Sequence, residues 1–170
     1  MLGITPESII PADIDETPFP AEKPLDYVTR IARSKAEKVA ENHTGRPILS
    51  ADTVVAVGRR ILPKAEDEQT ARECLALMSG RRHRVLTSVC VVTPQGTYYQ
   101  KTATTTVRMA PLTAAMTEAY IASGEWEGKA GGYAIQGLAA SFIPYIAGSH
   151  STVVGLPLYE TAQLLKRLGK

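Results

Sequence analysis

The sequence predicts an α/β fold in which a mixed sheet is flanked by helices. Its clearest sign is a nearly continuous apolar run, rich in β-branched residues, at 48–57, which is typical of a strand covered on both faces. Two longer β-patterned stretches at 84–93 and 97–109 flank the turn Pro94-Gln95-Gly96, which predicts a hairpin. Apolar residues at helical spacing recur between the strands, so helices are expected to pack against the sheet.

The remaining elements follow in chain order. The first 24 residues contain five prolines, and they predict irregular chain apart from a short apolar piece at 8–10 that suggests an edge strand. A helix is expected at 26–42, with Val28, Ile31 and Val39 on one face. The other expected elements are a return strand ending at Pro63-Lys64, helices at 67–79 and 113–124, a strand at 141–146 and a last helix between Pro157 and Gly169.

Length and composition narrow the function classes. A chain of 170 residues fits one domain, and a net charge of +2 is too small to indicate nucleic acid or an anionic membrane surface as a partner. No run approaches the roughly 18 apolar residues that span a bilayer, and the first residues lack the pattern of a signal peptide. Cys74 and Cys90 have no nearby cysteine or histidine at zinc-ligand spacing. We therefore expect a cytoplasmic protein with two buried thiols.

Asp52 carries the strongest chemical signal. Aspartate is a poor strand former, and this one lies in the middle of the apolar run at 48–57. An ionised carboxylate there is costly unless it is paired or binds a metal. A structural aspartate at a bulge is the alternative, but perturbed carboxylates concentrate at functional sites, which favours a functional role.

Three further charged residues suit phosphate chemistry when taken together with Asp52. Lys35 falls inside the apolar stripe of its helix, so its ammonium must either reach water or face an anion. Glu16 lies in an acidic loop and Lys64 follows a proline, and a surface position would explain each of them alone. Carboxylates hold a divalent cation that bridges phosphate oxygens, while lysines neutralise the remaining charge.

The segment 124–137, GEWEGKAGGYAIQG, contains five glycines. It is not a Walker A loop, because the glycine spacing is wrong and Ala130 follows the lysine where Ser or Thr is required. Its glycines would let the backbone approach a ligand, and the Gln136 amide suits a base or sugar edge, although a flexible surface loop is an equal alternative. Thr87 and the hydroxyl-rich 149–152 carry no signal alone, since Ser and Thr are common in turns.

These segments together resemble the Maf family, also called septum formation proteins. The matching stretches keep the family's order and cover nearly the whole chain. They are DIDETP (13–18), YVTRIARSKA (27–36), SADTVV (50–55), SGRRHRVLT (79–87), GEWEGKAGGYAIQG (124–137) and GSHSTVVGLPL (148–158).

The resemblance implies an inosine-triphosphatase-like α/β fold, with an elongated sheet, two lobes around a cleft, and usually a homodimer. It also implies a nucleoside triphosphate pyrophosphatase that depends on a divalent metal, Mg²⁺ or Mn²⁺. The GKAGGYAIQG segment resembles the branch that acts on dTTP and UTP rather than the branch that acts on 7-methyl-GTP. In the implied mechanism an activated water attacks the α-phosphorus and pyrophosphate leaves.

The resemblance also implies a role for individual residues. Asp52 matches the proton acceptor, and Asp52 with Glu16 matches the carboxylates near the metal. Lys35 and Lys64 match lysines that bind phosphate. The positions tied to substrate choice are Thr53 and Gln136.

One departure from the family pattern concerns the first residues. Family members begin with a strand and a loop of the form S-x-S-P-R-R, followed by a helix that leads to LGI, whereas this sequence starts at Met1-Leu2-Gly3-Ile4. We therefore expect one Maf-like domain over 1–170 that lacks the strand, the loop and most of the first helix. Without the serine and arginines that would grip the triphosphate, weak or absent activity is expected.

Two alternatives come from other functional classes. A catalytically inactive nucleotide-binding regulator of cell division would bind nucleotide without turnover. An RNA-binding module is disfavoured by the near-neutral charge and by a content of one Trp and two Phe for base stacking.

Overall fold

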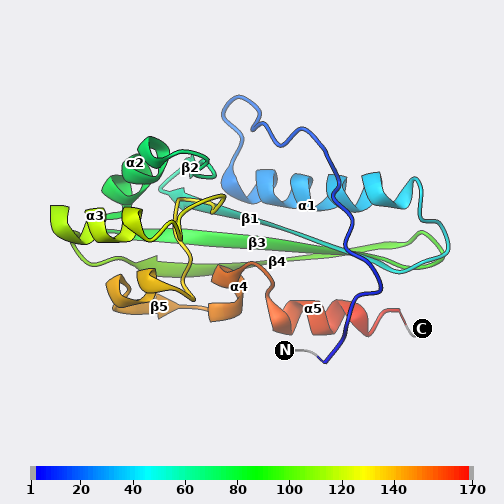
Figure 1. Cartoon of the computed structure of the whole chain (residues 1–170). Coiled ribbons are helices and arrows are strands. Elements are labelled where there is room, and N and C mark those ends of the chain that lie inside the picture. The colour runs from blue at the N-terminus through cyan, green and yellow to red at the C-terminus, as the bar shows by residue number, and fades with distance from the viewer. Residues whose placement is uncertain (1–2, 169–170) are drawn as a thin grey trace.

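The long strands of a five-stranded sheet run the length of the molecule, and helices cover both of its faces (Figure 1). The computed structural model describes residues 3–168. The strands are β1 (Ile48–Val57), β2 (Arg60–Leu62), β3 (Arg82–Val92), β4 (Tyr98–Arg108) and β5 (Tyr145–Ala147). The helices are α1 (Pro24–Ala40), α2 (Glu68–Met78), α3 (Ala114–Ala122), α4 (His150–Val154) and α5 (Leu158–Leu165), with a 3-10 helix η1 (Leu138–Phe142).

The sheet has the strand order β2-β1-β3-β4-β5, and all the pairings in the described part of the chain are antiparallel. The α/β fold with an elongated sheet and flanking helices is confirmed, but the expectation of a mixed sheet is wrong. Short turns join β1 to β2 and β3 to β4, and a tight hairpin permits only antiparallel strands. The helix α2 connects β2 to β3, and β3 pairs antiparallel with β1.

Two smaller expectations also differ from the structure. The segment 8–10 forms no strand and lies in irregular chain. Residues 138–142 form η1, which buries Ala139 and Phe142, so the strand expected at 141–146 is reduced to the three residues of β5 after Pro144. Proline cannot donate to a strand ladder, which explains why pairing begins only after it. The short helix α4 was not predicted, because its residues read as a turn.

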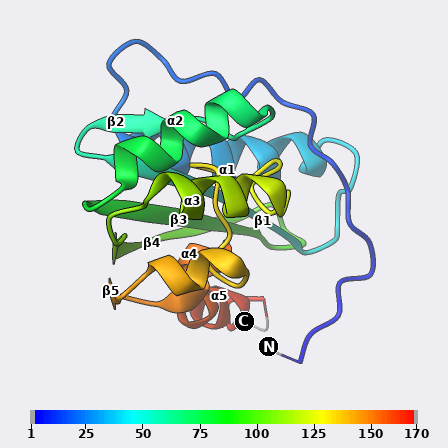
Figure 2. The same cartoon turned by 60° about the vertical axis from the view of Figure 1, so that its left-hand side comes forward.

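The two faces of the sheet carry different helices. Val28 and Ile31 of α1 pack against Val54, Ala56 and Leu86 on one face. The helices α4 and α5 cover the opposite face, as both views show (Figures 1 and 2). Because successive side chains of a strand point to opposite faces, even-numbered residues of β1 face α1 and odd-numbered ones face away from it.

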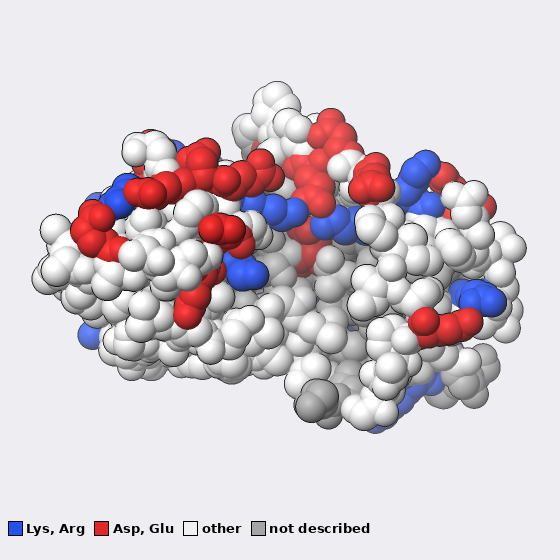
Figure 3. Space-filling view, in the orientation of Figure 1, with Lys and Arg blue, Asp and Glu red and all other residues white. Residues whose placement is uncertain are grey.

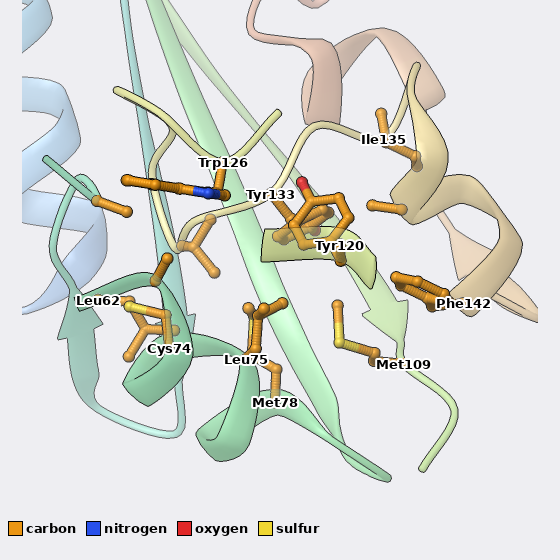
Figure 4. Packing of buried hydrophobic residues seen from close by; sticks show 14 of the residues in the cluster. Leu62, Cys74, Leu75, Met78, Met109, Tyr120, Trp126, Tyr133, Ile135 and Phe142 are labelled. Carbon is orange, nitrogen blue, oxygen red and sulfur yellow. The ribbon is translucent and has the colours of Figure 1, made fainter. Parts of the chain in front are cut away.

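The largest hydrophobic cluster lies at the end of the molecule where α2 and α3 pack beside the sheet (Figure 1), and Figure 4 shows its side chains from close by. Tyr120 of α3 and Phe142 of η1 meet edge to face, with 5.8 Å between ring centroids. Trp126 and Tyr133, both from the glycine-rich segment, are buried in the same cluster. This segment is therefore anchored by aromatic side chains, and the alternative of a flexible surface loop is not supported. None of the helices within residues 3–168 is long and apolar enough to cross a membrane.

Candidate active site

A cavity of about 230 Å³ opens at the edge of β1. β2 pairs only with Val55–Val57, so the preceding part of β1 has no partner strand on that side within residues 3–168. The cavity is lined by the glycine-rich segment, by the end of α4 and by four residues of β1, namely Ala51, Asp52, Thr53 and Val55. Figure 3 shows acidic and basic side chains meeting above a hollow at the centre of this face.

Asp52 points from β1 towards α1, and its side chain is 5% exposed. The Lys35 ammonium on α1 donates a hydrogen bond of 2.7 Å to Asp52 Oδ1. Burial raises the pKa of Asp52, and the neighbouring Lys35 ammonium opposes that rise. The mid-strand aspartate and the lysine in the apolar stripe thus face each other.

Glu16 and Lys64 extend this pair into a chain of four charges. Lys35 Nζ lies 2.7 Å from Glu16 Oε1, and Lys64 Nζ donates to Glu16 Oε2 at 2.6 Å. Burial alone would raise the pKa of Glu16, but the two ammonium groups outweigh it and hold that pKa below its usual range. Burial would lower the pKa of Lys35, and its bonds to Asp52 and Glu16 outweigh burial and raise it. All four charged residues singled out in the sequence therefore form one connected cluster, and its two ends, Asp52 and Lys64, line the cavity.

The loop that carries Glu16 is fixed by α1. The Tyr27 hydroxyl donates to the Glu16 carbonyl oxygen at 2.9 Å. Arg30 binds the Glu22 carboxylate through Nε and Nη2, each at 2.7 Å, and its guanidinium lies 3.9 Å from the centroid of the Phe19 ring. Sequence reasoning missed Tyr27 and Arg30. Their spacing of three residues on one helix face was the available signal.

The glycine-rich segment lies along the chain that follows β2. Ala130 forms a bridge with Lys64, and Gly128 N donates to Ala65 O at 2.8 Å. Gly131 has φ +67°, and a Cβ at this position would lie 3.0 Å from Val55 of β1. The close approach to β1 and the left-handed backbone both require glycine there.

Gln136 is exposed beside the cavity and forms no hydrogen bond within the described part of the chain, so its amide is available to a ligand. The Glu125 carboxylate accepts from Leu138 N at 2.6 Å, at the start of η1. A Cβ at Gly137 would overlap this carboxylate. Glu125 and Gly137 therefore fix the backbone that follows Gln136. No pattern in the sequence distinguishes Glu125 from other surface carboxylates.

Thr53 leaves β1 on the face opposite to Asp52. Its hydroxyl oxygen lies 2.8 Å from that of Thr87 on β3, and Thr87 in turn donates to the Thr152 carbonyl oxygen of α4 at 2.7 Å. Thr53 also lines the cavity. Charged and neutral polar groups thus reach one cavity from the two faces of the same strand.

His83 supports the cavity wall from within the core. It is 2% exposed, and its Nε2 lies 2.7 Å from the hydroxyl of Tyr133, which lines the cavity. Burial lowers the pKa of the imidazole from 6.5 to about 4, so His83 is neutral near pH 7.

The donor set at Asp52 and Glu16 fits a hard divalent cation. Two carboxylates converge on one ammonium, so positive charge is favourable at this point, and carboxylate oxygens are the ligands that Mg²⁺ and Mn²⁺ prefer. Residues 3–168 contain no group of three or more His, Cys, Asp or Glu side chains arranged to hold a metal. Substrate phosphate oxygens would have to complete the coordination.

Comparisons with known proteins show which family this chain resembles. The family model described as Maf-like protein matches residues 1–168. The dTTP/UTP pyrophosphatase of Paramagnetospirillum magneticum is 55% identical over 99% of this chain and 88% of the relative. The dTTP/UTP pyrophosphatase of Zymomonas mobilis is 58% identical over 99% of this chain and 83% of the relative. The chain belongs to the Maf family.

Proposed function

We propose that this chain is a nucleoside triphosphate pyrophosphatase that hydrolyses dTTP and UTP to the monophosphate and pyrophosphate. The names of its relatives support this reaction and these substrates. The observation that carries the proposal is the chain of charges Asp52–Lys35–Glu16–Lys64, whose two ends line a cavity. Such a site combines a buried carboxylate with cations for a polyphosphate.

Asp52 is proposed as the proton acceptor. Lys35 occupies Oδ1, while Oδ2 accepts no hydrogen bond within residues 3–168 and can take a proton from water. The water oxygen then bonds to the α-phosphorus, the bond from this phosphorus to the bridging oxygen breaks, and pyrophosphate leaves. Burial raises the pKa of Asp52, which strengthens it as a base.

Lys35 and Lys64 are proposed to bind the phosphates. Both ammonium groups are held by Glu16, whose side chain is 29% exposed, so a polyphosphate can reach them from the solvent side. Lys129 lines the same cavity and adds a third cation. The negative charge of a triphosphate is neutralised by such point charges.

Asp52 and Glu16 are proposed to hold Mg²⁺ or Mn²⁺, which would neutralise charge on the phosphate oxygens when bound. Thr53 and Gln136 are proposed to contact the nucleoside, since both are neutral polar groups that line the cavity.

We further propose that the protein works in the cytoplasm as a homodimer, with a nucleoside triphosphate as its substrate and without a nucleic acid or membrane partner. Cys74 and Cys90 are both free and buried, which suits a reducing compartment. Sedimentation of the purified protein would test the dimer, because a single species of monomer mass would contradict it.

The test of the function is pyrophosphate release from dTTP, UTP, CTP and 7-methyl-GTP, with Mg²⁺ or Mn²⁺. We expect dTTP and UTP to be turned over fastest, and chelation of the metal to stop the reaction. Binding of these nucleotides without turnover by a folded chain would contradict the enzyme proposal and favour the regulatory alternative. Faster turnover of 7-methyl-GTP would contradict the proposed substrates.

A further inference from the structure

Three threonines form a line of hydrogen bonds from the cavity into the core. Thr53 and Thr87 face each other across the β1–β3 ladder, with 2.8 Å between their hydroxyl oxygens. Thr87 donates to the carbonyl oxygen of Thr152 at 2.7 Å, and both of these residues are fully buried. We call this line, from Thr53 through Thr87 to the Thr152 carbonyl, the hydroxyl relay.

The relay has one direction because a hydroxyl group has one proton. The Thr152 carbonyl can only accept, so the proton of Thr87 is committed to it. The contact between Thr87 and Thr53 then requires Thr53 to donate. The oxygen of Thr53 is left with lone pairs and no proton for a ligand in the cavity.

Reversing the relay is unfavourable. If Thr87 turned its proton towards Thr53, the buried Thr152 carbonyl would lose this donor. An unmet buried acceptor disfavours such a state by about 5- to 100-fold. The buried residues Thr87 and Thr152 therefore determine that the Thr53 oxygen, at the surface of the cavity, accepts a hydrogen bond from a ligand and does not donate one.

A pyrimidine base suits the neighbourhood of Thr53. Val153 and Val154 of α4 add apolar surface to the same cavity, and Gln136 adds an amide that can donate and accept. The charged residues reach the cavity from the opposite face of β1. Phosphates and base would thus occupy different sides of this strand.

We propose that Thr87 is a positioning residue that makes Thr53 an obligate hydrogen-bond acceptor, and that this acceptor selects pyrimidines carrying an N3–H. The inference rests on the proposed function and adds a reason for its substrate class. Uracil and thymine have a donor at N3, whereas N3 of cytosine is itself an acceptor. If cytosine faced Thr53, the lone pair of its N3 would point at a lone pair of the Thr53 oxygen. A site that requires a hydrogen-bond donor rejects a ligand that has none at that position.

The test compares Thr87→Val with Thr105→Val. Both changes remove a buried hydroxyl that donates to a backbone carbonyl at α4, since Thr105 donates to the Ser149 carbonyl at 2.9 Å. Only Thr87 also contacts Thr53. The measured quantity is kcat/KM for UTP divided by kcat/KM for CTP, together with the melting temperature of each variant.

We expect Thr87→Val to lower the UTP/CTP ratio by about tenfold, because Thr53 regains a proton that it can donate to N3 of cytosine. Thr105→Val is expected to keep the wild-type ratio, and Thr87→Ser, which preserves the relay, to keep it as well. An unchanged ratio in a folded Thr87→Val protein would overturn the proposal, and so would an equal fall in Thr105→Val. If Thr87→Val does not fold, Thr87→Ala removes the same hydroxyl, and an unchanged UTP/CTP ratio in a folded Thr87→Ala protein would overturn the proposal. Failure of the proposed function would be distinguishable, since the wild-type protein would then release pyrophosphate from neither nucleotide.

Discussion

Consecutive residues of β1 enter two different polar networks. Asp52 faces α1 and begins a chain of ion pairs, whereas Thr53 faces the other side of the sheet and begins the hydroxyl relay. The ion pairs are partly open to solvent, with the Lys35 side chain 20% and the Lys64 side chain 46% exposed. The relay ends instead on fully buried groups.

This difference separates two tasks. Ion pairs in contact with water are weak and can rearrange around a charged substrate. A buried hydrogen-bond network has one satisfied arrangement and keeps it. Strand side chains alternate between the two faces of a sheet, so a cavity at a free strand edge can be lined by both networks. The ion pairs would serve the chemistry, and the hydroxyl relay, with its fixed donor and acceptor, would serve recognition of the base.

The largest expected effect is on the charged side. Asp52→Asn should lower kcat by about 10³-fold, since the amide cannot take the proton from water. Initial rates of pyrophosphate release, with circular dichroism as a check of folding, measure it. Asp67→Asn is the matched control, because Asp67 caps α2 through Thr70 N and is not among the residues that line the cavity. Equal loss in both variants would mean that the effect is one of folding.

The second effect is on the stability of the fold and concerns the buried imidazole of His83. Between pH 6.5 and 4 the unfolded chain binds a proton at His83 that the folded chain excludes, so this contribution to the free energy of unfolding falls as the pH falls. The loss approaches about 3 kcal/mol at the lower pH. Urea unfolding at several pH values in this range measures the free energy of unfolding, which should change less steeply with pH in His83→Gln than in the wild type. The same pH dependence of the free energy of unfolding in His83→Gln as in the wild type would contradict this role of His83.

Glu16 gives the third effect. Glu16→Gln should raise the Mg²⁺ concentration needed for half-maximal rate by about tenfold, because one of the two proposed carboxylates is lost. Titration of the rate with Mg²⁺ measures this change. Glu7→Gln is the control on the same segment, since Glu7 pairs only with exposed Arg46 in the described structure. A metal requirement that is the same in all three proteins would remove Glu16 from the proposed metal site.

The smallest effect is expected at Gln136. Gln136→Ala should raise the KM for UTP by about fivefold and leave kcat nearly unchanged, because a hydrogen bond to the nucleoside is lost in both ground and transition states. Steady-state kinetics with UTP separates the two constants. Gln69→Ala on the surface of α2 should change neither. A fall in kcat at constant KM would instead connect Gln136 with the chemistry.

Two members of the charged network could be predicted because they break local rules. Asp52 interrupts an apolar strand and Lys35 interrupts an apolar helix stripe, and such conflicts mark functional sites. Thr87 breaks no rule, since threonine is common in strands, and its role depends on a contact 65 residues away along the chain. The strand expected at 141–146 failed for a related reason, because its apolar residues pack as the helix η1 against a distant cluster. Tertiary contacts of this kind leave no local pattern in a sequence.

The separate roles of the two faces of β1, chemistry at Asp52 and base recognition at Thr53, are tested most directly by measuring kcat/KM for UTP and CTP in Asp52→Asn and Thr53→Val. We expect Asp52→Asn to lower kcat/KM for both nucleotides by the same factor and to leave their ratio unchanged. Thr53→Val should instead lower the UTP/CTP ratio while CTP turnover changes little. A changed ratio in Asp52→Asn, or an equal loss for both nucleotides in Thr53→Val, would contradict these separate roles.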